Sequence, residues 1–355
     1  MTSQTLPVAL VVPLQGPTGI YGPSCLACAE LAVELVNARN GIAGREVELI
    51  VVDAGRRPEA VATEVGRLVD SGRVEAVAGW HISTVRNAIA HRIGGRVVYA
   101  YAAMHEGHVS DVPGLFMLGE RPLNQLLPAA HWMREQLGIG HWAVVGNDSL
   151  FPRVTGATAR LALQSTRSRV VSETYVPLGT TDFTPVLARL REGHADGVIM
   201  LLMGPDAVHF NQQFAGLGLA EGIARFSPGI EENTLLGGGP MVHDNLYAAA
   251  AYFDGMGTVE SNELAQAYYA RYGRWAPALN AVGESCYEAI LFLAHLGRIS
   301  GGIDLAAVGG LRAGTFYDGP RGLVRLDGSL TDQDVYLAAA DGMEFVVQER
   351  IARVG

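Results

Sequence analysis

Short apolar runs alternate with helical patterns along the first hundred residues. Four of these runs predict buried strands, at residues 8–12, 47–52, 74–78 and 97–101. The amphipathic stretches between them predict helices at about 23–37, from Pro58, and around Asn87. Continuous apolar strands separated by single helices indicate a parallel sheet covered on both faces.

The same alternation restarts after the run at 115–118. Strands are predicted at 142–145, 170–176 and 197–202, with helices from Pro122 to Leu137, from Pro152 and after Asp182. The run at 246–253 leads to two long helices, and the tail predicts antiparallel strands at 323–326, 336–340 and 344–348. We therefore expect an α/β protein with two doubly wound parallel-sheet lobes.

The expected lobes are discontinuous in sequence. Lobe I is predicted to comprise residues 1–119 and 254–326, and lobe II residues 120–253 and 327–355. Because no flexible linker separates them, several chain crossings should form a hinge around a cleft.

Composition narrows the chemistry of the chain. All 26 Lys+Arg positions are arginine. The absence of lysine excludes Schiff-base enzymes, pyridoxal-phosphate anchoring and a P-loop lysine. A formal charge of −10 with scattered arginines also argues against a nucleic-acid partner.

The N-terminus and the cysteines bear on the compartment. Residues 1–7 have no basic region before the first apolar run, so we predict no signal peptide and a cytoplasmic protein as the sequence stands. A leader removed earlier would make it periplasmic or extracellular. No stretch reads as the roughly 20 apolar residues that insert into a membrane, and the odd count of 3 cysteines favours a reducing compartment.

Two motifs point to redox or metal chemistry only superficially. Cys25 and Cys28 form a C-x-x-C, but Cys28 also lies in a core stripe with Leu31 and Leu35. A zinc site needs a second ligand pair, which is not visible. The segment 105–108 has two histidines but lacks the H-E-x-x-H spacing. We expect no metal site.

Catalytic and nucleotide-binding motifs are also incomplete. The segment 283–287 lacks the closing glycine of a nucleophile elbow, and 16–22 lacks the G-x-G pair of a dinucleotide fingerprint. We therefore expect no cofactor and no catalytic residues.

The loops that follow the predicted strands are the candidate site. In a parallel α/β lobe, ligands bind beyond the carboxyl ends of the strands, where helix N-termini present unsatisfied N–H groups. These loops are residues 15–21, 79–84, 101–106, 147–151 and 203–206. Ser83 and Thr84 precede a helix, so they either cap it or bind a ligand carbonyl or carboxylate.

The chain resembles the type I periplasmic-binding-like proteins, the branched-chain amino-acid and amide/urea receptors, over nearly its whole length. The segments that carry this resemblance are 13–17, 21–22, 32–37, 41–45 and 76–79 followed by Ser83. Within the family it is most similar to the amide-binding regulators of amidase operons, through 83–88, 106–107, 146–148 and 151–153.

The resemblance implies two lobes that close over a small ligand without covalent chemistry. It implies that Ser83 binds the polar head of the ligand and that Phe151 stacks on it from the other lobe. The candidate ligand-binding residues are Tyr21, Trp80, His81, Ser83, Thr84, Tyr101, Ala103, Met104, Ser149, Phe151, Met203, Asp206 and Glu231.

Three departures from the amide binders bear on the ligand. His81, Ala103 and Phe151 stand where those proteins carry hydroxyl side chains. A ligand that needs those hydroxyls should bind poorly, which disfavours acetamide and favours a larger or more apolar amide, acid or amino acid.

An α-amino acid also needs an acidic partner for its ammonium group. Asp206 and Glu231 are the candidates, and both have the alternative role of helix-start residues. We lean against a zwitterionic ligand.

Two uses of such a binding protein remain open. As a cytoplasmic amide-type sensor it would signal to a regulatory protein, which the missing leader favours. As the receptor of an ABC transporter it would dock on permease subunits, which the wider family favours. The rival from another class is an α/β amide hydrolase that uses His81 or His105.

Overall fold

The computed structural model describes residues 5–107, 111–309 and 314–351, and the chain divides into two compact units. Unit 1 contains the chain up to Gly119 and Gly257–Gln333, and unit 2 contains Glu120–Met256 and the chain from Asp334 onward. The sequence placed the later divisions at 254 and 326. The second division lies further on because β13 (Leu330–Asp332) pairs with strands of unit 1.

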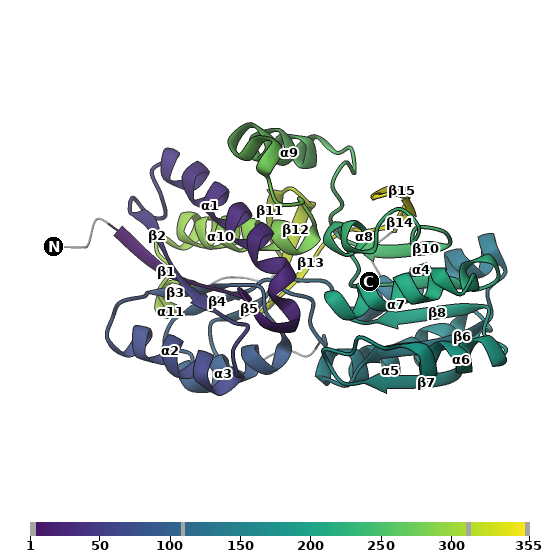
Figure 1. Ribbon diagram of the computed structural model, residues 1–355. Coiled ribbons are helices and arrows are strands. Elements are labelled where there is room, and N and C mark those ends of the chain that lie inside the picture. Colours follow the sequence, from purple (N-terminus) through teal and green to yellow (C-terminus); the bar gives the residue numbers. More distant parts are fainter. Residues whose placement is uncertain (1–4, 108–110, 310–313, 352–355) are drawn as a thin grey trace. The chain divides into compact units, whose positions relative to one another are not determined.

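Unit 1 is built on an eight-stranded sheet whose parallel core is extended by antiparallel strands (Figure 1). Its order is β11-β12-β13-β5-β4-β3-β1-β2, and β1 to β5 are parallel to one another. The strands are β1 (Thr5–Val12), β2 (Glu46–Asp53), β3 (Ala76–Gly79), β4 (Val98–Tyr101), β5 (Leu115–Met117), β11 (Thr315–Gly319), β12 (Gly322–Asp327) and β13. The predicted α/β class with a parallel sheet is confirmed, although the sheet is mixed at one edge.

The helices of unit 1 include a central pair from opposite ends of the sequence. They are η1 (Gly16–Tyr21), α1 (Gly22–Ala38), α2 (Pro58–Asp70), α3 (Ser83–Ile93), α9 (Val259–Tyr272), η3 (Gly273–Trp275), α10 (Ala281–Ser300) and α11 (Leu305–Val308). Helix α1 packs along α10. Gly283 permits their close approach, since a Cβ there would lie 2.9 Å from the Cβ of Ser24 and 3.1 Å from the Sγ of Cys28.

Helix α1 corrects one sequence expectation. In the described residues, Gly16–Ala38 is long and apolar enough to cross a membrane by length and composition, contrary to our reading of the sequence. However, 56% of its most apolar window is buried, and Cys25 and Cys28 are fully buried in it. The apolar character of this segment is therefore that of a core helix, and the core-stripe interpretation of Cys28 fits this burial.

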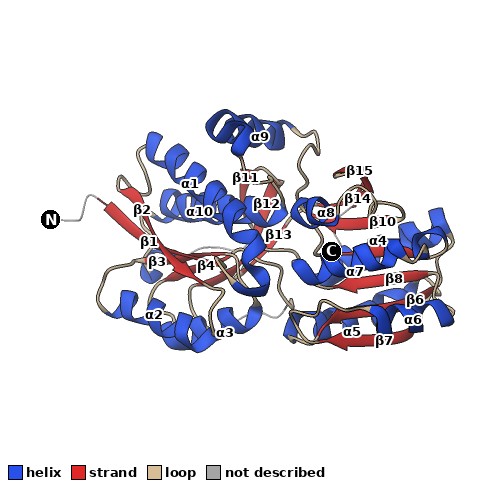
Figure 2. Cartoon of the chain, in the orientation of Figure 1, coloured by secondary structure: helices blue, strands red, loops and turns tan. Residues whose placement is uncertain are grey.

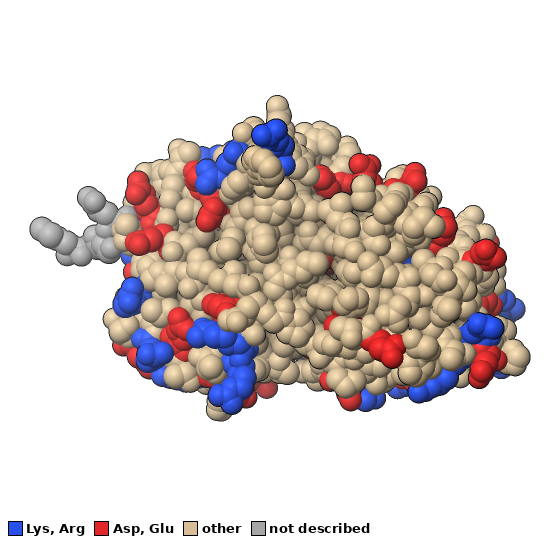
Figure 3. All heavy atoms as spheres, viewed as in Figure 1, with Lys and Arg blue, Asp and Glu red and all other residues tan. Residues whose placement is uncertain are grey.

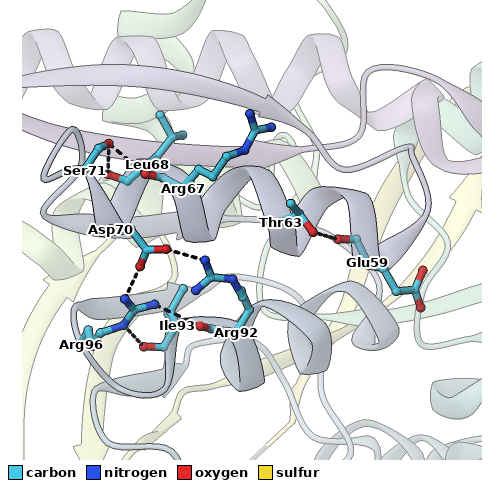
Figure 4. A network of polar contacts seen from close by, with 9 residues as sticks. All are labelled: Glu59, Thr63, Arg67, Leu68, Asp70, Ser71, Arg92, Ile93 and Arg96. Carbon is cyan, nitrogen blue, oxygen red and sulfur yellow. Dashed lines mark hydrogen bonds and ion pairs between the residues drawn. The ribbon is translucent and has the colours of Figure 1, made fainter.

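A surface ion-pair network joins the ends of α2 and α3 (Figure 4). Asp70, the last residue of α2, pairs with Arg92 near the end of α3 and with Arg96 just beyond it. All three side chains are exposed, where solvent screens the attraction between the charges. The network therefore contributes little to the stability of the fold.

Unit 2 repeats the plan with a seven-stranded sheet (Figure 2). Its order is β15-β14-β10-β9-β8-β6-β7. The strands are β6 (His141–Asn147), β7 (Arg169–Val176), β8 (Gly197–Leu201), β9 (Ala224–Ser227), β10 (Leu246–Ala250), β14 (Val335–Asp341) and β15 (Glu344–Ile351). The helices are α4 (Pro122–Leu137), α5 (Leu150–Ser165), α6 (Thr184–Glu192), α7 (Pro205–Gly216), η2 (Leu219–Glu221) and α8 (Glu232–Gly238).

The core of unit 2 is a cluster of buried apolar side chains. Trp142, Met133 and Leu337 belong to one buried cluster that joins α4 to the sheet.

On the face of the molecule visible in Figure 3, arginine and acidic side chains are interspersed. That face presents no large basic region, in keeping with the negative formal charge.

Candidate functional site

The turn from β3 into α3 carries the main candidate site residues of unit 1. Gly79 ends β3 with φ +138°, and a Cβ there would lie 2.2 Å from the carbonyl oxygen of Val11. Helix α3 begins at Ser83, and Ile82 takes the N-cap position. The interpretation of Ser83 as a plain N-cap is therefore wrong, because the residue with the extended N-cap conformation is Ile82, and Ser83 is the first residue of the helix.

The first turn of α3 is a set of hydrogen-bond donors. The amides of Val85 and Arg86 donate to the Ile82 carbonyl and are the first to bond inside the helix. The amides of Ser83 and Thr84 precede them, so they point out of the helix end, where the helix dipole is positive. The Ser83 side chain is buried and that of Thr84 is exposed. This turn suits the binding of an anionic or carbonyl oxygen.

Aromatic side chains from β4 fix His81 beside this turn. The Tyr99 hydroxyl lies 2.7 Å from Nε2 of His81, and the Tyr101 hydroxyl donates to the His81 carbonyl at 2.8 Å. Burial lowers the pKa of His81 to about 3. At neutral pH this imidazole is therefore uncharged and a weak base, which opposes the hydrolase reading that relied on His81.

The depressed pKa of His81 predicts a loss of stability in acid. The unfolded chain takes up this proton near pH 6.5, whereas the folded chain takes it up only near pH 3. Stability should therefore fall as the pH is lowered through this window, by up to about 1.4 kcal/mol per pH unit. Urea unfolding of wild type and His81→Gln at a series of pH values measures it: the variant should lose less on acidification. Parallel pH profiles would contradict this assignment.

A buried ion pair lies next to Ser83, and sequence reasoning did not include it. Nη2 of Arg86 is 2.8 Å from Oε2 of Glu106, with both side chains under one-tenth exposed. The Arg86 guanidinium also lies 5.0 Å from the ring centre of Tyr101. Burial acts to raise the pKa of Glu106, but the neighbouring Arg86 guanidinium outweighs it and the pKa is lowered. The pair adds no net side-chain charge beside the α3 turn.

The other predicted residues of unit 1 lie on the adjoining loops. Trp80 is buried, and its ring centre is 4.8 Å from that of Tyr21, edge to face. Ala103 and Met104 follow β4, with Ala103 buried and Met104 half-buried. His105 is buried and its Nδ1 accepts a hydrogen bond from the Gly107 amide. The last histidine of the 105–108 motif lies outside the described residues.

In unit 2, Asp206 on α7 is hydrogen-bonded to two other segments of the chain, the end of β6 and the loop at 179–180. It lies in the first turn of α7, and its Oδ2 accepts hydrogen bonds from the amides of Gly179 and Thr180 and from the Asn147 side chain, at 2.9, 3.1 and 2.7 Å. Asn147, the last residue of β6, also accepts from the Met203 amide at 2.9 Å. Burial raises the pKa of Asp206. These contacts support the helix-start role over that of an ammonium partner.

Glu231 has a capping role as well. It is the N-cap of α8, and its carboxylate accepts from the amides of Asn233 and Thr234 and from the Thr234 hydroxyl. Burial raises the pKa of Glu231 to about 7.

Glu232 is a second buried carboxyl, and sequence reasoning missed it because it follows the capping residue directly. Its Oε1 accepts from the Asp254 amide at 3.0 Å, and burial raises its pKa to about 8. Its Oε2 has no hydrogen-bond partner within the part of the chain that the structure describes.

The remaining predicted residues of unit 2 also follow the carboxyl ends of its strands. Ser149 precedes α5 in an extended conformation without a side-chain cap bond. Phe151 and Met203 are half-buried, after β6 and β8. Within the described residues, no group of three or more His, Cys, Asp or Glu side chains is placed to hold a metal ion.

The chain belongs to the periplasmic binding protein family, whose sequence model matches residues 5–343. Solved structures agree in fold. A solute-binding protein of an ABC transporter from R. palustris, in complex with benzoate, shares 19% identity over 99% of this chain and 98% of its own, with a TM-score of 0.87.

Two amino-acid-binding proteins are similar to a comparable degree. A branched-chain amino acid transporter substrate-binding protein from Streptococcus pneumoniae, in complex with isoleucine, shares 18% identity over 99% of this chain and 100% of its own, with a TM-score of 0.84. A leucine-binding protein from Thermotoga maritima shares 17% identity over 98% and 99%, with a TM-score of 0.87. The chain therefore has the type I periplasmic binding fold, while the finer resemblance to amide-binding regulators stays a prediction.

Proposed function

We propose that this protein is the solute-binding receptor of an ABC importer and works outside the cytoplasmic membrane. Its family membership supports this, and the R. palustris neighbour is such a receptor. We prefer this reading to the cytoplasmic sensor, and permease subunits to a regulatory protein as partners. Non-enzymatic binding is part of the proposal, because the candidate site offers an uncharged His81 rather than an activated base.

The proposed ligand is a small carboxylate held at the first turn of α3. The observation that carries this is the donor set of that turn, the Ser83 and Thr84 amides with the buried Ser83 hydroxyl. A helix N-terminus stabilises negative charge. The two ligand-bound neighbours were solved with benzoate and isoleucine, which both carry a carboxylate.

We favour a carboxylate without an ammonium group, such as an aromatic or aliphatic acid. Asp206 and Glu231, the acidic residues that sequence reasoning offered to an ammonium group, instead accept hydrogen bonds from the backbone. An amino acid remains the second candidate, because Oε2 of Glu232 is buried without a partner among the described residues.

Calorimetry with benzoate, 4-hydroxybenzoate, isoleucine and acetamide tests the ligand class. We expect a carboxylate to bind and Ser83→Ala to weaken it by about 1–3 kcal/mol, since one buried donor is lost. Small-angle scattering of the same samples should show a smaller radius of gyration with ligand if the two units close as the sequence predicts.

Ser71→Ala is the matched control, because it removes an exposed serine hydroxyl at the end of α2. It should leave affinity unchanged. Binding of acetamide without any carboxylate would overturn the ligand class, and equal affinity of wild type and Ser83→Ala would overturn the site.

A further inference from the structure

A buried cluster of two carboxyl groups and one guanidinium lies in unit 1, away from the α3 turn. Glu284 and Glu288 lie one helical turn apart on α10, and both are at most 1% exposed. Arg321, in the turn between β11 and β12, is 2% exposed, and its Nε donates to Oε2 of Glu284 at 2.6 Å. The cluster therefore contains two acids for one base.

Glu288 lies directly against the backbone of the same turn. A Cβ built on Gly319 would lie 2.5 Å from Oε2 and 2.6 Å from Oε1 of Glu288, so a side chain at position 319 would displace this carboxylate. The titratable or charged groups that interact with Glu288 are Glu284 and Tyr287 on α10, Tyr317 on β11, and Arg321. The ring of His295, one further turn along α10, packs on Tyr317 with the ring centres 5.1 Å apart.

The same arginine reaches the place where the chain leaves unit 1. Nη1 of Arg321 is 3.5 Å from the carbonyl oxygen of Leu118, which precedes the crossing at Gly119. That oxygen also accepts from the Thr331 hydroxyl at 2.8 Å and from the Gln333 amide group at 3.1 Å, and Gln333 ends the last segment of unit 1. Arg321 from the β11–β12 turn therefore lies at the same Leu118 carbonyl as Thr331 and Gln333. Leu118 precedes the first crossing from unit 1 to unit 2, and Gln333 precedes the last.

We propose that Glu284 and Glu288 share one proton, and that this proton keeps Arg321 in place against the Leu118 carbonyl. The segments around Leu118 and Gln333, called here the crossing segments, are then held in unit 1 only while the cluster is protonated. Fully ionised, the cluster would carry one uncompensated negative charge away from water. One bound proton removes that charge and leaves a single carboxylate for Arg321.

The direction of the pH effect follows from this charge balance. Burial raises the pKa of both carboxyl groups, Arg321 opposes that rise, and their mutual repulsion increases it for Glu284. The folded cluster therefore holds a proton that the unfolded chain releases at lower pH. The stabilising effect of this proton is present at acidic pH and is lost as the pH rises through the pKa of the carboxyl pair in the folded protein. We expect the crossing segments to loosen in alkali.

Hydrogen exchange on the full-length, ligand-free protein tests the proposal. Peptides covering residues 114–121 and 328–334 are followed from about pH 5 to about pH 9, after correction for the intrinsic exchange rate. In wild type, protection should fall by about tenfold or more over this range, because one pKa unit corresponds to a factor of ten. In Glu288→Gln, whose neutral amide resembles the protonated acid, protection should stay nearly constant.

Peptides from β8, an inner strand of the unit 2 sheet, serve as the internal control, because unit 2 contains none of the cluster residues. Their protection should follow the same course in both proteins. Infrared spectroscopy gives an independent readout at neutral pH. The absorption of protonated carboxyl groups should be weaker in Glu284→Gln than in wild type by the amount of one group, while the contribution of the protonated Glu232 in unit 2 remains in both proteins. Either identical pH profiles for wild type and Glu288→Gln, or equal protonated-carboxyl absorption in wild type and Glu284→Gln, would overturn the proposal. Because no ligand is used, the result is independent of the proposed transport function.

Discussion

Gly79→Ala is expected to destabilise the protein by about 3 kcal/mol or more and to abolish ligand binding. Two effects add at this position. The backbone φ of +138° is one that L-residues rarely adopt, and the new Cβ would lie 2.2 Å from the Val11 carbonyl of the neighbouring strand β1. Relieving that overlap must displace the turn that carries Trp80, His81 and Ser83. Urea unfolding and calorimetry with the best carboxylate measure the two consequences.

Gly72→Ala separates backbone conformation from steric overlap. Gly72 also has a positive φ, +66°, but a Cβ there meets nothing within 4 Å. This control should cost about 1 kcal/mol and leave the affinity unchanged. If the two variants proved equally stable, the close packing of β3 against β1 would not be what requires glycine at position 79.

Arg225→Met is expected to cost about 3–5 kcal/mol. Arg225 is fully buried in β9, and its guanidinium donates to the Asn211 side chain and to the carbonyls of Val242 and Asp244. Burial lowers the pKa of Arg225 to about 10, so it remains charged at neutral pH. Methionine fills much of the volume but leaves those three acceptors unsatisfied. Denaturant unfolding measures the loss.

Arg153→Met in the same unit is the matched control. Both arginines lie over an aromatic ring, Arg153 on Tyr175 at 4.0 Å and Arg225 on Phe214 at 4.7 Å. Arg153, however, is exposed and pairs with the equally exposed Asp148, so its replacement should destabilise the protein far less than Arg225→Met does. Similar losses for the two variants would show that ring stacking, and not the buried hydrogen bonds, is what Arg225 contributes.

The hydrophobic pattern predicted most of the strands but not β9, which lies in the middle of the unit 2 sheet. Strand β9 carries Arg225 between Ala224 and Phe226, and a buried arginine interrupts the apolar run by which the other strands are recognised. Its acceptors come from α7 and from the loop before β10, so the pattern along β9 alone does not indicate that the charge is satisfied.

The placement of the candidate residues after strand ends was predictable, whereas the contacts of the acidic candidates were not. Ser83, Phe151 and Met203 follow strand ends, and the topology of a parallel sheet determines that placement. The role of Asp206 depends on amides of the loop at 179–180, which only the fold brings to it. The same holds for Arg86 and Glu106, which pair across 20 positions. A charged residue in a sequence does not reveal which distant partner will satisfy it.

The packing of α1 on α10 also affects the order in which the chain can assemble. Strands β6 to β10 of unit 2 occupy one uninterrupted stretch, whereas unit 1 needs a helix that is synthesised about 250 residues after the one it covers. During synthesis on the ribosome, the apolar face of α1 that contains Cys25 and Cys28 therefore remains uncovered until α10 has been made, after most of unit 2. During that interval the nascent chain exposes an apolar helix face, to which a chaperone that binds apolar helices would bind.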